Sequence, residues 1–384
     1  MDKLLNSGLK LGVVGGGQLG KMLAIDASRW QLEISCLESG DNPPIQSVCR
    51  EIKPGSITSY EDVLEFGQGV DYLTVESDSV NAKALIELES KGVKTFPRGQ
   101  TLEIIQDKYL QRKFCAENNL PTPEFSHYSN KESLVSSHKQ GSLTLPKIIK
   151  TCRAGYDGKG VFLAKSEKDL EDLPDTELLV EELVDIKKEF SVIIVRSSEG
   201  ETTCYPAIEL FMRENAYLVD YFISPVDLKK KLGEQMEEIA KKLVISLDHV
   251  GVLAIEFFLD SNDEIFINEC SPRPHNSGHH TIEGSVTSQY EQHLRAVLGL
   301  PLGKCEMKGI AGVVNLLGDQ NYSGRPNYRG LEECLKLAGT YVHIYGKNET
   351  RPLRKMGHIT TVGQELPEVL EKIEIIRKEA GVGK

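Results

Sequence analysis

The sequence predicts an α/β protein of two or three domains, and three observations support this prediction. The chain has 384 residues, which is too many for one ordinary hydrophobic core. Its 40% hydrophobic and 27% charged residues are typical of a folded globular protein. Strand-like and helix-like segments alternate through the first hundred residues. Such alternation predicts a parallel sheet covered by helices.

The N-terminal elements follow one another closely. Strand patterns occupy residues 10–15, 32–37, 71–75 and 93–96, and helical patterns occupy residues 18–28 and 80–88. A helix with many charged residues is expected at 101–118. It ends there because Pro121 and Pro123 block its continuation. The first domain boundary is expected at or within this helix, so that residues 1–105 form a Rossmann-like domain.

The rest of the chain changes character twice. Between residues 146 and 269, strand patterns are separated by glycine turns, with one clear helix at 227–247. The apolar stripe of this helix indicates core packing. After Pro301, short strands and turns lead to a terminal helix at 366–378. We therefore expect a central domain at 106–300 and a small C-terminal domain at 301–384.

Several classes of protein are disfavoured. The net charge of −12 argues against a nucleic-acid partner, because phosphate backbones require basic surfaces. The N-terminus lacks the apolar run of a signal peptide, and no stretch approaches the roughly 18 apolar residues of a membrane span. The eight cysteines form no CxxC pair, which indicates reduced thiols and neither a zinc site nor disulfides. We expect a cytoplasmic protein with no membrane partner.

A first glycine-rich turn, Gly15–Gly20, fits the GxGxxG pattern between a strand and a helix. The free N–H groups at a helix N-terminus form an anion site, and Glu38 lies where a dinucleotide site has its ribose-binding acid. An NAD-dependent oxidoreductase would have this pattern. A substrate-phosphate turn or a purely structural turn explains it equally well.

A second glycine-rich loop, Gly155–Gly160, lies between strand patterns instead. Lys150 ends the preceding strand, and Lys159 lies within the loop. Strand, loop and strand predict a hairpin that folds over a triphosphate, with Lys150 placing a cation on the phosphates. The alternative is an ordinary glycine hairpin.

Acidic residues follow on later strands. Glu181 and Glu182 lie in the strand pattern 178–184, which could offer backbone groups to adenine and a carboxylate to ribose hydroxyls. Glu256 and Glu269 occupy apolar strands joined by a turn, so they are expected on neighbouring antiparallel strands. Acids in buried strands need partners, and such oxygen ligands suit Mg²⁺. Salt-bridged structural acids are the alternative.

Two polar segments complete the candidate site. Residues 271–281 form a proline-limited loop after Glu269, and its three histidines lack any ligand spacing known for zinc. This loop is expected to bind substrate beside the metal. A late basic cluster contains Lys347, Arg351, Arg354, Lys355 and His358. It predicts a pocket for a phosphate monoester, or else a solvated run of charge.

Together these segments resemble the ATP-grasp superfamily, and within it the family of N5-carboxyaminoimidazole ribonucleotide synthetases. The resemblance rests on Gly15–Gly20, Gly155–Gly160, Asn268–Glu269 and His275–His279, in that order. It implies a Rossmann-like domain, an ATP-grasp domain whose mobile glycine-loop lid spans about 122–184, and a C-terminal domain. It also implies a ligase that joins bicarbonate to aminoimidazole ribonucleotide in purine biosynthesis while ATP becomes ADP and phosphate. Mg²⁺, or Mn²⁺ in its place, and a homodimer are implied as well.

The resemblance assigns roles to individual residues. The ATP-binding group is Lys108, Lys150, Gly155, Tyr156, Asp157, Gly158, Lys159, Gly160, Glu181, Glu182, Val184, Glu189, Asn268 and Glu269. The metal ligands are Glu256 and Glu269. The substrate-binding group is Gln18, Arg273, His275, Asn276, Ser277, Lys347, Arg351, Arg354 and Lys355. The catalytic group is Tyr156, Asp157, Arg273 and Lys355.

Three segments depart from the family pattern: Ala154 replaces a common glycine, Met212 replaces a histidine that contacts the nucleotide, and residues 76–80 match loosely. There are two alternative functions. Another ATP-grasp ligase, such as a formate-dependent transformylase or a biotin carboxylase, fits the ATP site but not the 271–281 loop. The oxidoreductase leaves the second glycine loop and the strand acids unexplained.

Overall fold

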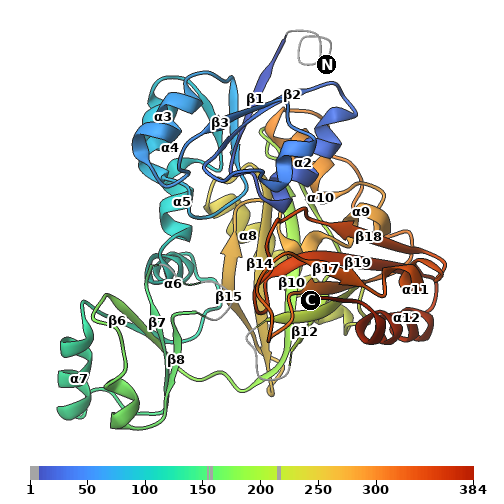
Figure 1. The fold of residues 1–384 in the computed structure, drawn as a ribbon. Coiled ribbons are helices and arrows are strands. Elements are labelled where there is room, and N and C mark those ends of the chain that lie inside the picture. Colours follow the sequence, from blue (N-terminus) through green and yellow to red (C-terminus); the bar gives the residue numbers. More distant parts are fainter. Residues whose placement is uncertain (1–7, 154, 156–158, 214–217) are drawn as a thin grey trace.

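The computed structural model describes residues 8–153, 155, 159–213 and 218–384 (Figure 1). Its N-terminal sheet contains β1 (Lys10–Val14), β2 (Glu33–Glu38), β3 (Glu51–Pro54), β4 (Tyr72–Val75) and β5 (Lys94–Phe96). The strands are parallel in the order β3-β2-β1-β4-β5. The helices α2 (Gln18–Ser28), α3 (Tyr60–Gly67) and α4 (Ala82–Ser90) accompany it, with the short helix η1 (Pro44–Ser47). The predicted Rossmann-like sheet is confirmed.

The sequence reasoning missed β3 and α3 in this part of the chain. β3 is short and ends at Pro54, so its apolar pattern is weak. α3 had a usable signal, because Ser59 is its N-cap and accepts a hydrogen bond from the backbone N–H of Asp62.

The single helix predicted at 101–118 is wrong. The structure has two helices, α5 (Gly99–Ile105) and α6 (Lys108–Glu117). Asp107 separates them as the N-cap of α6, and its carboxylate accepts from the backbone N–H groups of Tyr109 and Leu110. The chain can therefore change direction at this point, as Figure 1 shows.

Residues 125–181 form a small subdomain, at the lower left of Figure 1. It contains β6 (Phe125–Tyr128), α7 (Lys131–Lys139), β7 (Lys147–Thr151), β8 (Val161–Ala164), η2 (Glu167–Leu170) and β9 (Leu178–Glu181). The antiparallel sheet runs β6-β9-β7-β8. A separate apolar cluster, which includes Leu134, Ile149 and Leu178, fills its interior. The small subdomain thus has a core of its own.

The central part of the chain builds a large antiparallel sheet. Its strands are β10 (Ile186–Arg196), β11 (Thr202–Cys204), β12 (Ile208–Met212), β13 (Val219–Ser224), β14 (Gly251–Asp260) and β15 (Ile265–Ser271). α8 (Lys230–Ser246) packs on it through Met236, Ala240 and Leu243. This helix begins three residues later than the predicted Asp227, so Leu228 precedes it.

The C-terminal segment extends the same sheet. β16 (Ile310–Leu317) pairs with β13, and β19 (Lys355–Gly363) and β18 (Thr340–Ile344) continue outward. The remaining elements are η3 (Asn276–Gly278), α9 (Thr281–Gly284), α10 (Gln289–Val297), β17 (Asn327–Arg329), α11 (Leu331–Leu335), α12 (Leu366–Glu379) and β20 (Gly381–Gly383). The C-terminal strands β16, β18 and β19 therefore share a sheet with the central part, while β17 and β20 pair as a separate two-stranded sheet.

Candidate active site

Two carboxylates occupy the first glycine-rich turn. The backbone N–H of Gly16 donates to Glu38 at 2.8 Å, and that of Gly20 donates to Glu76 at 3.0 Å. A Cβ atom at Gly17 would lie 2.4 Å from an oxygen of Glu76, so a side chain there would displace this carboxylate. Burial raises the pKa of Glu76, while the amides of Gly20 and Gly17 oppose that rise. Acidic side chains at this helix N-terminus would repel a pyrophosphate, which disfavours the dinucleotide interpretation.

The second glycine-rich loop connects β7 to β8, which pair as the predicted antiparallel hairpin. Gly155 and Gly160 have φ angles of +95° and +75°, and a side chain at Gly155 would meet the Lys159 carbonyl oxygen. The loop therefore depends on glycine at both ends. Tyr156, Asp157 and Gly158, as well as Ala154, lie outside the described residues. Lys159 is exposed.

Lys150 belongs to a buried ion-pair group. Its Nζ lies 2.8 Å from one oxygen of Glu181, and the other oxygen of Glu181 lies 2.5 Å from Nε of Arg112. Burial lowers the pKa of Lys150, although the charge of Glu181 opposes this. Burial also disfavours the charged form of Glu181, but Arg112 and Lys150 outweigh it and hold its pKa below the usual value. The sequence reasoning missed Arg112, because nothing local shows that it is buried.

Further residues of the predicted ATP group lie on α6, after the end of β9, and on β10. Lys108 begins α6, and its backbone N–H donates to the Cys152 carbonyl oxygen at 2.8 Å. Glu182 is exposed and lies 2.7 Å from Nζ of Lys147, and Val184 follows it. Glu189 is half-buried on β10, where burial raises the pKa of its carboxyl group.

Glu256 on β14 and Glu269 on β15 lie on neighbouring antiparallel strands, as predicted, and they are directly opposite each other. Contrary to the expectation of burial, Glu256 is half-buried and Glu269 is exposed. The reason is a register shift after this pair, which leaves Asn268 without a partner in the ladder as a β-bulge. Ile267 and Cys270 are buried, whereas the two consecutive residues between them are not. The bulge therefore keeps Asn268 and Glu269 out of the core together.

Arg273 is held by an acid from the N-terminal part of the chain. Its Nε and Nη2 donate to the two oxygens of Asp78 at 2.9 and 2.5 Å, and the Ser271 hydroxyl donates to the same carboxylate. Asp78 lies in the 76–80 segment that matches the family pattern only loosely. The sequence reasoning missed the roles of Glu76 and Asp78, although their acidity was a usable signal.

The loop at 275–280 contacts both the large sheet and the first glycine-rich turn. The Ser277 hydroxyl lies 2.9 Å from the hydroxyl of Ser191, which pairs with Glu256 across β10 and β14. On the other side, Nε2 of Gln18 donates to Oδ1 of Asn276 at 3.4 Å. His275 completes the loop through a 2.9 Å hydrogen bond with Ser277. The predicted substrate loop thus lies beside the strand that carries a predicted metal ligand.

Behind this loop, His279 connects Asn276 to two buried tyrosines. Oδ1 of Asn276 can only accept, so Nε2 of His279, at 3.1 Å, must carry a proton. Burial and the neighbouring imidazoles hold the pKa of His279 well below its usual value, so its Nδ1 is an acceptor for Tyr290. The Tyr345 hydroxyl lies 3.2 Å from His279 and 3.1 Å from Nδ1 of His358. The hydrogen bonds therefore fix the orientation of Asn276.

Part of the predicted basic cluster adjoins this histidine network. Nζ of Lys347 donates to the Lys355 carbonyl oxygen at 2.7 Å and lies 5.4 Å from the centre of the Tyr345 ring. Burial lowers the pKa of Lys347 to about 8, with a further contribution from Arg354. Nη1 of Arg354 donates to the Glu349 carbonyl oxygen, and Arg351 is exposed. His358 is buried against its neighbours instead of joining the cluster.

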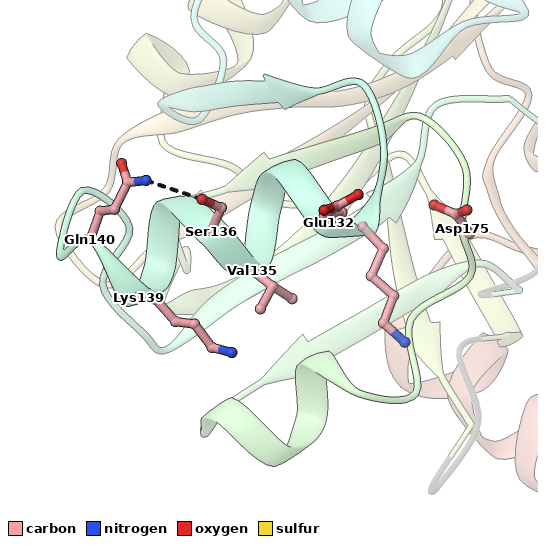
Figure 2. A pocket seen from close by; sticks show the side chains of 7 residues that line it. Glu132, Val135, Ser136, Lys139, Gln140 and Asp175 are labelled. Atoms are coloured by element: carbon pink, nitrogen blue, oxygen red, sulfur yellow. Dashed lines mark hydrogen bonds between the residues drawn. The ribbon is translucent and has the colours of Figure 1, made fainter.

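Other features of the surface and interior lie apart from these residues. An open hollow of about 640 Å³ lies along α7, lined by Val135, Lys139 and Asp175 among others (Figure 2). It contains none of the predicted site residues.

All eight cysteines are among the described residues, and they are free thiols. In the described ranges, no three or more His, Cys, Asp or Glu side chains cluster as a metal site, and no helix is long and apolar enough to cross a membrane.

The N5-carboxyaminoimidazole ribonucleotide synthase of Bacillus subtilis is 35% identical over 380 residues, covering 97% of this chain and 96% of that protein. The chain belongs to the N5-carboxyaminoimidazole ribonucleotide synthase family. Family models match successive segments: the ribonucleotide synthetase preATP-grasp domain at 9–106, the ATP-grasp domain at 113–290, and the phosphoribosylaminoimidazole carboxylase C-terminal domain at 311–372. The predicted ATP-grasp architecture is confirmed, and the chain is an ATP-dependent ligase.

Solved structures of the same family agree with this fold over nearly the whole chain. The N5-carboxyaminoimidazole ribonucleotide synthetase of Thermotoga maritima has a TM-score of 0.89 and 39% identity, covering 98% of this chain and 99% of its own. The synthase of Aspergillus clavatus in complex with ADP and 5-aminoimidazole ribonucleotide has a TM-score of 0.85 and 29% identity, covering 96% and 98%.

Proposed function

We propose that this chain catalyses the ATP-dependent carboxylation of 5-aminoimidazole ribonucleotide with bicarbonate. The products are N5-carboxyaminoimidazole ribonucleotide, ADP and phosphate, in purine biosynthesis. Beyond family membership, one observation carries the proposal. The Ser277–Ser191 contact and the row Ser191, Glu256 and Glu269 across three strands bring the substrate loop beside the strand acids. Two substrates that must react with each other would meet in such a site.

For ATP, the proposed ligands are Lys108, Lys150, Glu181, Glu182, Val184, Glu189, Asn268 and Glu269, together with the Gly155–Gly160 loop. Lys150 would place its charge on the phosphates, because it lies between Glu181 and Asn268 at the end of the loop hairpin. The small subdomain would act as the lid that closes over ATP, since it has its own core and carries the loop. Closure would shield a labile intermediate from water.

The residues present fit a magnesium ion. Glu256 and Glu269 offer two hard carboxylate ligands from paired strands, and Mg²⁺ completes its coordination with phosphate oxygens and water. When bound, it would neutralise charge on the phosphoryl group during transfer. Mn²⁺ prefers the same kind of ligand.

In the proposed reaction, bicarbonate oxygen attacks the γ-phosphoryl group, which gives carboxyphosphate and releases ADP. The amino group of the ribonucleotide then takes the carboxyl group, and phosphate leaves. Gln18, Arg273, His275, Asn276, Ser277, Lys347, Arg351, Arg354 and Lys355 would bind the ribonucleotide. Tyr156, Asp157, Arg273 and Lys355 would form the catalytic group, and Asp78 would hold Arg273 in place through both of its oxygens.

The wider setting follows the same proposal. The protein would act in the cytoplasm as a homodimer, and its dimeric state rests on the family resemblance alone. The net charge of −12 supports small-molecule substrates over a nucleic-acid partner. Domain boundaries near residues 105 and 300 are supported by family models that end at 106 and begin again at 311. The last of these models also favours this reaction over that of a biotin carboxylase.

A coupled assay of ADP release tests the proposal. We expect release to require both aminoimidazole ribonucleotide and bicarbonate, and to stop when either is omitted. Formate in place of bicarbonate is the control for a transformylase, and it should not support release. Equal release with and without the ribonucleotide would refute the proposed reaction.

A further inference from the structure

Arg112 is a buried arginine that joins three elements of the fold. It lies on α6, and only 2% of its surface is exposed. Its Nε contacts Glu181 on β9 of the small subdomain at 2.5 Å. Its Nη1 donates to the Ile267 carbonyl oxygen on β15 at 3.1 Å. One guanidinium therefore links the small subdomain to the strand that carries the bulge.

These contacts form a closed ring of interacting residues, which consists of Arg112, Glu181, Lys150, Asn268 and Ile267. Glu181 accepts from Arg112 with one oxygen and from Lys150 with the other. Nζ of Lys150 makes a long 3.5 Å contact with Asn268, and Asn268 directly follows Ile267. Each member of the ring is thus positioned by two others.

Arg112 makes the net charge of the ring positive. Two cations and one carboxylate leave a net charge of +1 beside the proposed phosphate position. Without Arg112, the whole charge of Glu181 would act on Lys150 in a buried setting, where such attraction is strong. Lys150 and Glu181 alone would form an ion pair with no net charge, which would attract a phosphate only weakly.

We propose that Arg112 is a positioning residue for ATP: it occupies one oxygen of Glu181, so that Lys150 remains available to the phosphates. The proposal rests on the ATP site proposed above. It adds a residue that does not itself contact the nucleotide.

Calorimetric titration with MgATP, without the ribonucleotide, tests this role. We expect Arg112→Met to weaken ATP binding about tenfold, as loss of a hydrogen bond to a charged group does. Lys113→Met is the matched control, because Lys113 is the next residue of the same helix and its side chain is 52% exposed. Binding by R112M equal to that of the wild type would overturn the proposal.

A double variant separates positioning from general damage to the fold. If Arg112 acts through Glu181, the effect of R112M should disappear once Glu181→Gln has removed the carboxylate. E181Q and R112M/E181Q should then bind ATP equally well. A further loss in the double variant would mean that the two residues act independently, and it would contradict the proposal.

A second substitution at Arg112 separates an effect on ATP binding from an effect on folding. It is needed because R112M removes one of the two cations that pair with the buried Glu181, and this destabilises the fold. Arg112→Gln keeps a hydrogen-bond donor near Glu181 while removing the charge. If R112M does not fold, R112Q should still show weakened ATP binding, and unchanged affinity there would overturn the role. Failure of ribonucleotide-dependent ADP release would count against the proposed reaction alone, since ATP binding is measured separately.

Discussion

At the scale of the single residue, burial makes the charge of Lys347 depend on pH near neutrality. Its pKa is lowered to about 8, so the ammonium is present below that pH and is lost above it. The attraction of this lysine for a phosphate monoester should therefore fade between pH 7 and pH 9. We expect KM for the ribonucleotide to rise across this window in initial-rate measurements.

Lys347→Met identifies the group responsible for this pH dependence. The variant lacks this charge at every pH. Its KM for the ribonucleotide should therefore be high already at pH 7 and should not rise further between pH 7 and pH 9. Lys378→Met is the control, since its side chain is 82% exposed on α12. A wild-type pH profile in K347M would assign the effect to another group.

Tyr345 has a different role, because its hydroxyl joins His279 to His358 inside the protein. Tyr345→Phe would leave ring nitrogens without this partner, which costs about 1–3 kcal/mol. Chemical denaturation should report that loss. KM for the ribonucleotide should rise while KM for ATP stays unchanged, because the network supports Asn276. Tyr341→Phe, at an exposed position on β18 just before Tyr345, should change neither.

At the scale of the element, the hairpin of β14 and β15 presents the strand acids to solvent without disturbing its core face. Glu269→Gln should lower magnesium-dependent ADP release by about a hundredfold or more. The melting temperature should hardly change, because Glu269 is exposed. Glu264→Gln in the exposed turn of the same hairpin is the control. Full activity in E269Q would remove Glu269 from the metal site.

Elements with strong local signals were predictable from the sequence. The apolar spacing of α2 gave its observed bounds, Gln18–Ser28, and the apolar strands around Glu256 and Glu269 were correctly predicted to pair. β3, which is short, was missed, and so was the break at Asp107, which lies inside one continuous charged segment. The bulge at Asn268 was also missed, because an extra residue in a ladder depends on its partner strand and not on local pattern.

At the scale of the whole molecule, the large sheet continues across the proposed boundary at residue 300, through the pairing of β13 with β16. Removing residues 301–384 would expose β13 as an edge and uncover core residues such as Ile223. We expect such a truncated chain to be insoluble or unfolded, as judged by expression and circular dichroism. A soluble fragment with a cooperative melting transition would show that the central part folds alone.

The contacts that assemble the site are those that the sequence could not reveal. Asp78 and Arg273 are 195 positions apart, and Gln18 and Asn276 are 258 apart. The residue types were recognisable as candidates, but their partners depend on how the sheets pack. Arg112 is the clearest case: the next residue, Lys113, is also basic, and only the packing of α6 distinguishes the buried arginine from the exposed lysine.

The bulge at Asn268 also bears on which changes in chain length the hairpin can tolerate. Buried Ile267 and Cys270 are separated by two residues, where an unbroken ladder would have one. Deletion of Asn268 alone would therefore restore regular pairing, with every apolar residue still on its original side and Glu269 still facing solvent. We therefore expect the core face of the hairpin to tolerate this deletion, at the expense of the contact between Asn268 and Lys150.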